Sequence, residues 1–202
     1  GLPMGSLRGV PIKIHFSFFL LLGAAALLSG NGLWASSLCL MLFLLSLLHE
    51  FAHLTAARAL GGYYNEIILW PLGGLSEAET PLRPTTQLLV TASGPVFHLV
   101  ILILFLPWSL RRLPQALWPL PNDNYLALFV CLNQLVLLAN LLPAFLTDGG
   151  KLWQSFLWHF LGFSKATAMT LVAALLSGIG GLVLVLMGYS LLFGIAGVLL
   201  LL

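Results

Sequence analysis

Charged residues are scarce in this chain, at only 7% of its 202 residues. A soluble domain carries about 25% charged residues, so this sequence lacks the side chains needed to cover a water-facing surface. Hydrophobic residues make up 60% of the chain, and its mean hydropathy is +1.05. The net charge of +2 is small and scattered, which argues against nucleic acid as a partner. We therefore predict an integral membrane protein whose surroundings are the lipid bilayer.

Cysteine is nearly absent as well. Cys39 and Cys131 each lie within an apolar run, and they lack the CxxC spacing of a metal or redox motif. We interpret both as packing residues rather than as metal ligands or a disulfide.

Long apolar runs dominate what is present. Crossing a ~30 Å hydrocarbon core takes ~20 residues of helix, and run length predicts an all-α polytopic membrane protein with a single domain over residues 1–202. The six predicted spans cover about residues 14–30, 33–60, 86–110, 124–147, 165–187 and 188–202. Apolar residues at helical spacing between Gly150 and Gly162 predict an interfacial helix rather than a seventh span. Because the last run is short and ends without a polar cap, we expect the natural protein to continue past Leu202.

The distribution of basic residues predicts the orientation. With the N-terminus in the cytoplasm, six of the eight Lys and Arg residues lie inside and two lie outside. Cytoplasmic loops are enriched in these residues, so a cytoplasmic N-terminus is expected. The inside set is Arg8, Lys13, Arg58, Arg83, Lys151 and Lys165, and the outside set is Arg111 and Arg112.

Residues 61–85, between the second and third predicted spans, do not have a helical pattern. Residues 63–70 favour a strand and 71–74 favour a turn, which predicts a short β-rich segment at the membrane edge. This strand, including Tyr64 and Ile67, is a candidate to hold an extended substrate by edge pairing, although it can equally close the cytoplasmic rim. Gly73 and Gly74 suit a tight turn near the mouth of a water channel.

The most informative motif is His49-Glu50-Phe51-Ala52-His53, an HExxH inside the second predicted span. Two imidazoles four residues apart project from one helix face and can coordinate one metal ion. Glu50 flanks that ion and suits a general base that accepts a proton from bound water. A polar helix face that lines a cavity is the alternative. The active site is expected near the cytoplasmic end of the span.

A catalytic zinc needs a third protein ligand and an open position. Asp148 is the best candidate, since the second and fourth spans both run from outside to inside and place it at the same depth as His53. The alternative is a simple helix-terminus residue before two glycines. Pro143 is expected to break the fourth span, and Asn140, one turn earlier, can satisfy freed backbone groups or hold a substrate carbonyl.

At these residues the chain resembles the site-2 protease family of intramembrane zinc metalloproteases. HEFAH, the Pro-Leu-Gly-Gly at 71–74, Ser93-Gly94-Pro95 and the stretch from Asn140 through Asp148-Gly149-Gly150 occur in family order, and residues 8–15 resemble the lead into the family's first span. The resemblance implies one zinc ion per chain, held by His49, His53 and Asp148. It also implies that Glu50 is the base and that Asn140 assists the substrate or the oxyanion.

One departure from the family pattern is His98, which follows Ser-Gly-Pro after two intervening residues, at a position where an asparagine is usual. The imidazole can replace the amide's hydrogen bonds or be a core residue. Several relatives with this N-terminal lead carry a pair of cytoplasmic CBS modules after the last span, which fits the expected continuation past Leu202.

The predicted function is therefore hydrolysis of a peptide bond in or near a transmembrane helix of another, single-span membrane protein. Two alternatives stay open: a membrane metal transporter or sensor, and a catalytically silent scaffold that binds membrane helices. A transporter predicts metal-binding groups distributed along a pathway, whereas a scaffold does not need Glu50. The sequence does not decide whether the protein is a homo-oligomer.

Overall fold

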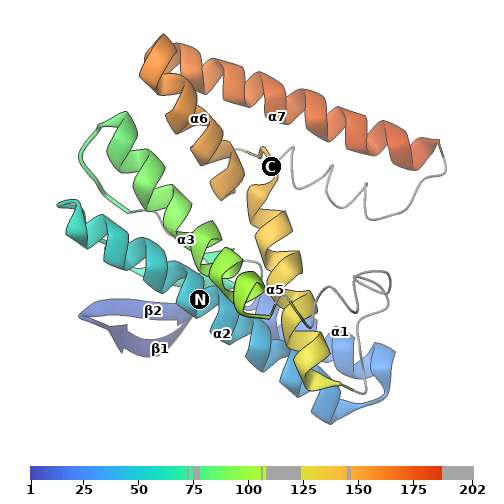
Figure 1. The fold of residues 1–202 in the computed structure, drawn as a ribbon. Helices are drawn as coiled ribbons and strands as arrows, with labels where there is room; N and C mark the ends of the chain where they lie inside the picture. Colours follow the sequence, from blue (N-terminus) through green and yellow to red (C-terminus); the bar gives the residue numbers. More distant parts are fainter. Residues whose placement is uncertain (72, 75–77, 106, 108–123, 145–146, 188–202) are drawn as a thin grey trace.

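The structure is a computed structural model, and it describes residues 1–71, 73–74, 78–105, 107, 124–144 and 147–187. Its described part is mostly helical (Figure 1). The helices are α1 (Ser17–Ser29), α2 (Gly32–Ala59), α3 (Pro84–Leu104), α5 (Tyr125–Leu141), α6 (Asp148–Leu161) and α7 (Phe163–Leu186).

Three helices are long and apolar enough to cross a membrane among the described residues: α2, α3 and, within α7, Phe163–Gly180. Two shorter apolar helices, α1 and α5, accompany them. The predicted spans at 14–30 and 124–147 therefore correspond to helices of 13 and 17 residues, below the ~20 residues of a full span. The predicted span at 188–202 lies outside the described residues, so the count of six spans stays a prediction.

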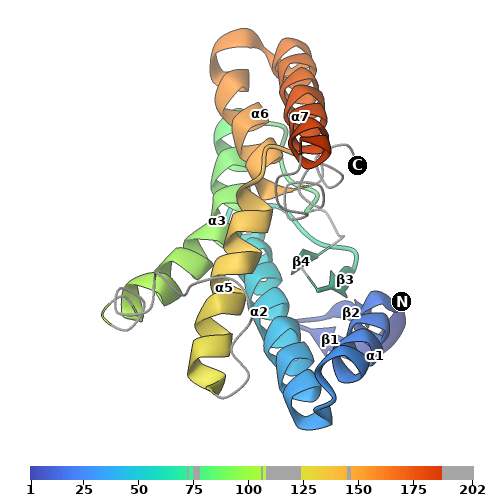
Figure 2. The same ribbon diagram turned by 90° about the vertical axis from the view of Figure 1, so that its right-hand side faces the viewer.

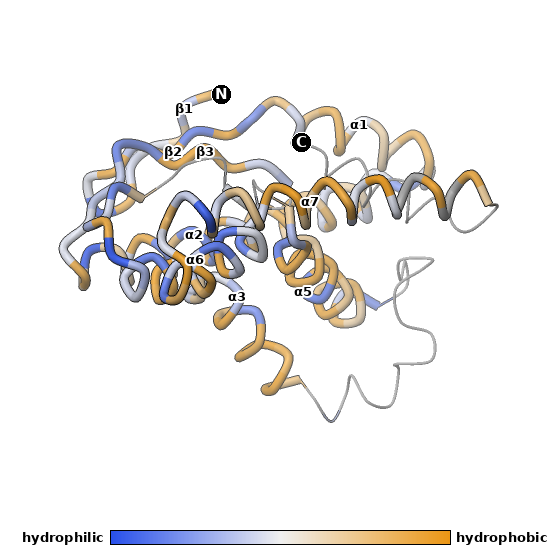
Figure 3. Tube along the Cα trace, turned by 90° about the horizontal axis from the view of Figure 1, so that it is seen from above, coloured by the Kyte–Doolittle hydropathy of each residue, from blue (hydrophilic) through white to orange (hydrophobic). Residues whose placement is uncertain are grey.

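Helix α2 is the centre of the arrangement. It packs against α1, α3, α5 and the strands β3 (Ile67–Trp70) and β4 (Gly73–Gly74), while α3 packs against α6 and α6 against α7. Figures 1 and 2 show α7 beside α6 and set apart from α2. Figure 3 shows that α1 and α7 are predominantly hydrophobic along their length, as expected for helices that face lipid.

Local signals explain where the helices begin and end. Asn31 caps α2, because its Oδ1 accepts a hydrogen bond from Trp34 N at 3.1 Å. Asn124 caps α5 in the same way through Ala127 N at 3.0 Å. Helix α5 ends at Leu141, and its C-cap Leu142 is extended, with φ −57° and ψ 140°. A residue before proline avoids the helical region, so Pro143 ends this helix as the sequence predicts.

A four-stranded sheet lies beside α2, in the order β1-β2-β3-β4, with β1 at Leu2–Leu7 and β2 at Val10–Ile14. β1 and β2 form an antiparallel hairpin, β2 runs parallel to β3, and β3 pairs antiparallel with β4. β structure was predicted only between the second and third spans, and the N-terminal hairpin was not predicted. The alternation in Val10–Ile14, with residues 10, 12 and 14 buried, is the period-two signal of a half-buried strand, and the adjoining apolar run obscured it.

Candidate active site

Helix α2 places three polar side chains inside the protein. His49, Glu50 and His53 are 1%, 3% and 5% exposed, although their helix is otherwise apolar enough to span a membrane. Burying imidazoles and a carboxylate costs several kcal/mol unless they find polar partners or bind an ion. Such burial therefore indicates a ligand or a reactive site.

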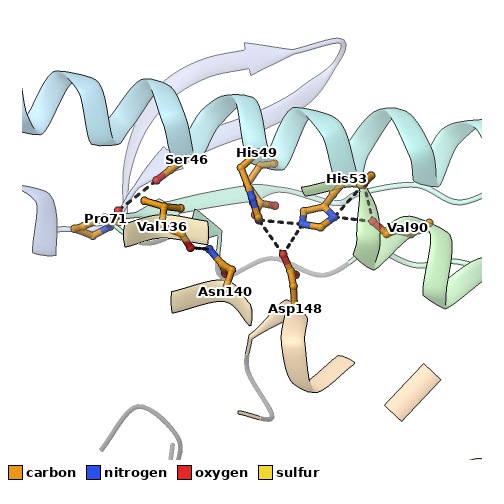
Figure 4. Close-up of polar contacts among 10 residues, drawn as sticks. Ser46, His49, His53, Pro71, Val90, Val136, Asn140 and Asp148 are labelled. Atoms are coloured by element: carbon orange, nitrogen blue, oxygen red, sulfur yellow. Dashed lines mark hydrogen bonds and ion pairs between the residues drawn. The ribbon is translucent and has the colours of Figure 1, made fainter. Parts of the chain in front are cut away.

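Helix α6 supplies a fourth polar side chain. Asp148, its first residue, lies with Oδ2 at 3.1 Å from His49 Nε2 and 3.2 Å from His53 Nε2. The two Nε2 atoms are 3.0 Å apart. Figure 4 shows both imidazoles pointing from α2 towards the Asp148 carboxylate.

These three donor atoms have the spacing of a metal site. Ligand atoms ~2.0–2.1 Å from a tetrahedral zinc ion lie about 3.3 Å from one another, close to the 3.0–3.2 Å separations found here. Two imidazoles and one carboxylate are also the donor types that zinc accepts. No other described group of three or more His, Cys, Asp or Glu side chains has its donor atoms this close together. The residues therefore fit one zinc ion, with a fourth position open.

The protonation of the donors suits this role. The pKa of Asp148 is shifted below its ordinary value. Burial raises this pKa, but the neighbouring His53 and His49 lower it by more than burial raises it. At neutral pH the side chain is thus a carboxylate. The Nδ1 of His53 lies 2.8 Å from Val90 O, which can only accept. Nδ1 therefore carries the proton, and the Nε2 lone pair faces the cluster.

Glu50 lies beside the cluster without being part of it. Its Oε1 is 3.9 Å from His49 Nε2, too far for a shared ligand position. Its Oε2 is buried and has no hydrogen-bond partner among the described residues. A carboxylate oxygen held free next to a metal site can accept a proton from a water molecule there.

Two glycines make room for these side chains. A Cβ built on Gly74 of β4 would contact the Glu50 carboxylate, with Oε2 only 2.6 Å away. A Cβ on Gly94 of α3 would lie 2.7 Å from His49 Nε2 and would also contact His53 Nε2. Real Cβ atoms do not approach so closely, so both positions need glycine as long as the polar side chains stay in place.

A cavity of about 290 Å³ opens onto this cluster. Its lining includes six residues of the predicted site: His49, Glu50, His53, Gly74, Asn140 and Asp148. Asn140 also donates from Nδ2 to Val136 O at 3.0 Å, one turn back in α5.

Two predicted substrate-binding residues lie elsewhere. Tyr64 is 8% exposed and Ile67 is fully buried, and both belong to the hydrophobic core. β3 already pairs with β2 at 67–69 and with β4 at 69–70. The prediction that this strand offers a free edge, with Tyr64 and Ile67 facing a substrate, is therefore wrong. The strand next to Glu50 is β4, which includes Gly73 and Gly74.

Several cavity residues were not predicted as part of a site. Lys151 lines the cavity one helical turn after Asp148, and Gln154, Ser155 and Trp158 continue along the same helix. Their spacing from Asp148 is the only sequence signal that places them on its face. His98 of α3 and Asn133 of α5 form a fully buried pair beside His49, and no motif or spacing in the sequence indicates that these two residues meet.

Similarity to known proteins provides independent information. No family model matches the chain. A putative zinc metalloprotease from Synechocystis sp. is 32% identical over 173 residues, which cover 79% of this chain and 45% of the relative. Stage IV sporulation protein FB from Bacillus subtilis is 31% identical over 169 residues, or 81% of this chain and 54% of the relative. The chain thus spans about half the length of the curated relatives it matches.

The fold also has a solved counterpart. The structure of the site-2 protease from Methanocaldococcus jannaschii superposes with a TM-score of 0.73 over 99% of this chain and 91% of the other, at 23% sequence identity. At this level of identity the similarity establishes the fold. A zinc metalloprotease from the same organism is 28% identical over 165 residues, which cover 80% of this chain and 47% of the relative.

Proposed function

The chain is a homologue of the zinc metalloproteases of the site-2 protease family, and from this premise we propose that it is an intramembrane metalloendopeptidase. It hydrolyses a peptide bond in or near a transmembrane helix of another membrane protein. His49, His53 and Asp148 hold one zinc ion, and Glu50 is the general base.

One observation carries the proposal: a buried Glu50 carboxylate lies within 4 Å of the donor triangle, at a cavity among apolar helices. Metal transport or sensing does not require a free carboxylate at this position, and neither does a scaffold. Hydrolysis does, because the attacking water must lose a proton.

The protein's own residues then have distinct tasks. When bound, zinc supplies Lewis acidity that makes a water molecule a better nucleophile. Glu50 accepts the proton of the attacking water and passes it to the leaving amine. The Val90 carbonyl keeps Nδ1 of His53 protonated, so that Nε2 stays a ligand. Asn140, in the same cavity, is placed to hold the substrate carbonyl or the developing oxyanion.

The substrate segment must be extended when it is cleaved. A helix hides its carbonyl groups in hydrogen bonds to residue i+4, so the peptide must unwind before water can attack. β4 lies at the end of the described strand order and beside Glu50. An extended segment that pairs with Gly73 and Gly74 would present its backbone to the cavity.

The remaining assignments follow from the sequence. The basic residues favour a cytoplasmic N-terminus, with the cavity towards the cytoplasmic side. A single-span membrane protein is the proposed substrate.

The decisive experiment compares wild-type protein with Glu50→Gln. Both are purified in detergent, analysed for zinc and tested on a panel of single-span substrates. We expect Glu50→Gln to keep stoichiometric zinc and to lose cleavage by about 10²–10⁴-fold, the usual contribution of a general base.

Two results would contradict the proposal. A Glu50→Gln protein that cleaves at the wild-type rate would exclude Glu50 as the base. A wild-type protein that binds no zinc would exclude the metal site itself.

A further inference from the structure

His49 and His53 differ in what their second ring nitrogen contacts. His53 Nδ1 donates to Val90 O and also lies 3.3 Å from Ser93 Oγ. His49 Nδ1 is buried and has no hydrogen-bond partner among the described residues. Metal-binding histidines almost always donate this second N–H to an acceptor, which fixes the tautomer and the ring orientation. His49, a proposed zinc ligand, therefore lacks the acceptor that would fix its tautomer and ring orientation.

A second orphaned nitrogen belongs to the neighbouring imidazole. The His98 ring centroid lies 5.1 Å from that of His49, and the ring planes differ by 35°. His98 is fully buried, and its Nε2 also has no partner among the described residues. Two adjacent rings thus each leave one nitrogen unpaired.

The partner of His98 decides which of its nitrogens carries the proton. Asn133 donates from Nδ2 to the backbone oxygen of His98 at 3.1 Å. A carbonyl oxygen can only accept, so the amide orientation is fixed and Asn133 Oδ1 must be the atom 2.7 Å from His98 Nδ1. His98 Nδ1 therefore donates, and Nε2 of the neutral ring is an acceptor.

The two orphaned atoms are chemically complementary. As a zinc ligand through Nε2, His49 must carry its proton on Nδ1 and needs an acceptor. His98 Nε2 is an acceptor that needs a donor. We infer that Asn133 and His98 position His49. Asn133 fixes the His98 tautomer, and one water molecule that accepts from His49 Nδ1 and donates to His98 Nε2 connects the two rings. His98 is thus a positioning residue.

This inference rests on the proposed zinc site, and its test uses zinc affinity rather than cleavage. His98→Met removes the acceptor and replaces the imidazole with an apolar side chain of similar length. His98→Gln places an amide oxygen near the position of Nε2. We expect His98→Met to bind zinc about 10–100-fold more weakly, the usual effect of losing such a partner, and His98→Gln to recover most of the affinity. Affinity is measured by chelator competition in detergent.

Two controls separate positioning from packing. Leu132→Met, next to Asn133 in the core of α5 and 1% exposed, changes shape without removing a polar group and should keep wild-type affinity. The melting temperatures of the metal-free variants show whether His98→Met and His98→Gln are equally stable.

A second variant tests the other end of the chain of contacts. Asn133→Leu has a similar size but removes the acceptor that fixes the His98 tautomer, so this variant should also weaken zinc binding. It provides the test if His98→Met does not fold. Wild-type affinity in Asn133→Leu or His98→Met, or equal losses in His98→Met and His98→Gln, would overturn the inference. A wild-type protein without zinc would instead overturn the proposed function.

Discussion

At the scale of single residues, two glycines set the space in which the polar groups of the site fit. Gly94 borders the two imidazoles and Gly74 borders the Glu50 carboxylate. Since the imidazoles are proposed ligands and Glu50 is the proposed base, the same small change at these two glycines should have different consequences.

Gly94→Ala should impair metal binding. Its new Cβ would lie 2.7 Å from His49 Nε2 and 2.5 Å from His49 Cε1, and would displace the ligands. We expect zinc affinity to fall at least about 10-fold, the lower end of the effect of disturbing ligand orientation, and cleavage to fall with it. Gly23→Ala in α1, where a Cβ meets nothing within 4 Å, is the matched control. Unchanged zinc affinity in Gly94→Ala would show that α3 can move away without cost.

Gly74→Ala should impair catalysis without removing the metal. The three atoms nearest to the new Cβ all belong to the Glu50 carboxylate. We expect stoichiometric zinc and a cleavage rate lower by up to about 10²–10⁴-fold, as for loss of the general base. Zinc content and cleavage are measured on the same preparation. Loss of zinc together with activity would indicate that β4 supports the ligands as well as the base.

At the scale of elements, the site is assembled from segments that are far apart in the chain. α2 supplies His49, Glu50 and His53, while the end of α5 and the start of α6 bring Asp148 to them. Thr147 stabilises the connection between α5 and α6, because its hydroxyl donates to Leu142 O at 2.5 Å and to Ala144 O at 3.0 Å. The break after Leu141 thus determines where α6 begins.

Pro143→Ala should loosen this connection. Without the proline, Leu142 is no longer kept out of the helical region. Helix α5 can then extend past Leu141, which would move Asp148 away from the two histidines. We expect weaker zinc binding, together with a loss of about 0.4–1 kcal/mol in unfolding free energy from the freer unfolded chain. Chelator competition and denaturant unfolding measure the two effects. Pro84→Ala, at the first turn of α3, is the control, because a proline there only pre-sets the helix.

A normal zinc affinity in Pro143→Ala would contradict this account of α5. It would mean that the packing of α6 against α3, rather than the break in α5, holds Asp148 in place.

At the scale of the whole molecule, the proposed orientation directs the cavity towards the cytoplasm. Gly32 begins α2 and Arg83 precedes α3. The proposed orientation puts position 32 outside and position 83 in the cytoplasm.

Single cysteines at these two positions test the orientation. In a background with Cys39→Ala and Cys131→Ala, we expect Gly32→Cys to react with a membrane-impermeant thiol reagent in intact cells. We expect Arg83→Cys to react only after permeabilisation. A Cβ at position 32 meets nothing within 4 Å, and Arg83 is exposed without a side-chain capping bond, so neither change should disturb the fold. The reverse labelling pattern would invert the topology.

The features that depend only on residues close together in the chain could be predicted from the sequence alone. The period of a helix puts His49, Glu50 and His53 near one another whatever surrounds them, and the restriction before Pro143 ends α5 at the predicted place. Scarcity of charge and long apolar runs indicated a membrane protein. Each of these depends only on residues close in the chain.

The tertiary structure decided what depends on distant residues. It showed that β3 is paired on both sides, that Ile67 is buried, and that the N-terminal residues pair into a hairpin. It also brought Asn133 to His98 and His98 to His49. Strand partners and polar contacts between helices depend on which surfaces meet after folding, and residue spacing along one helix or strand does not specify them.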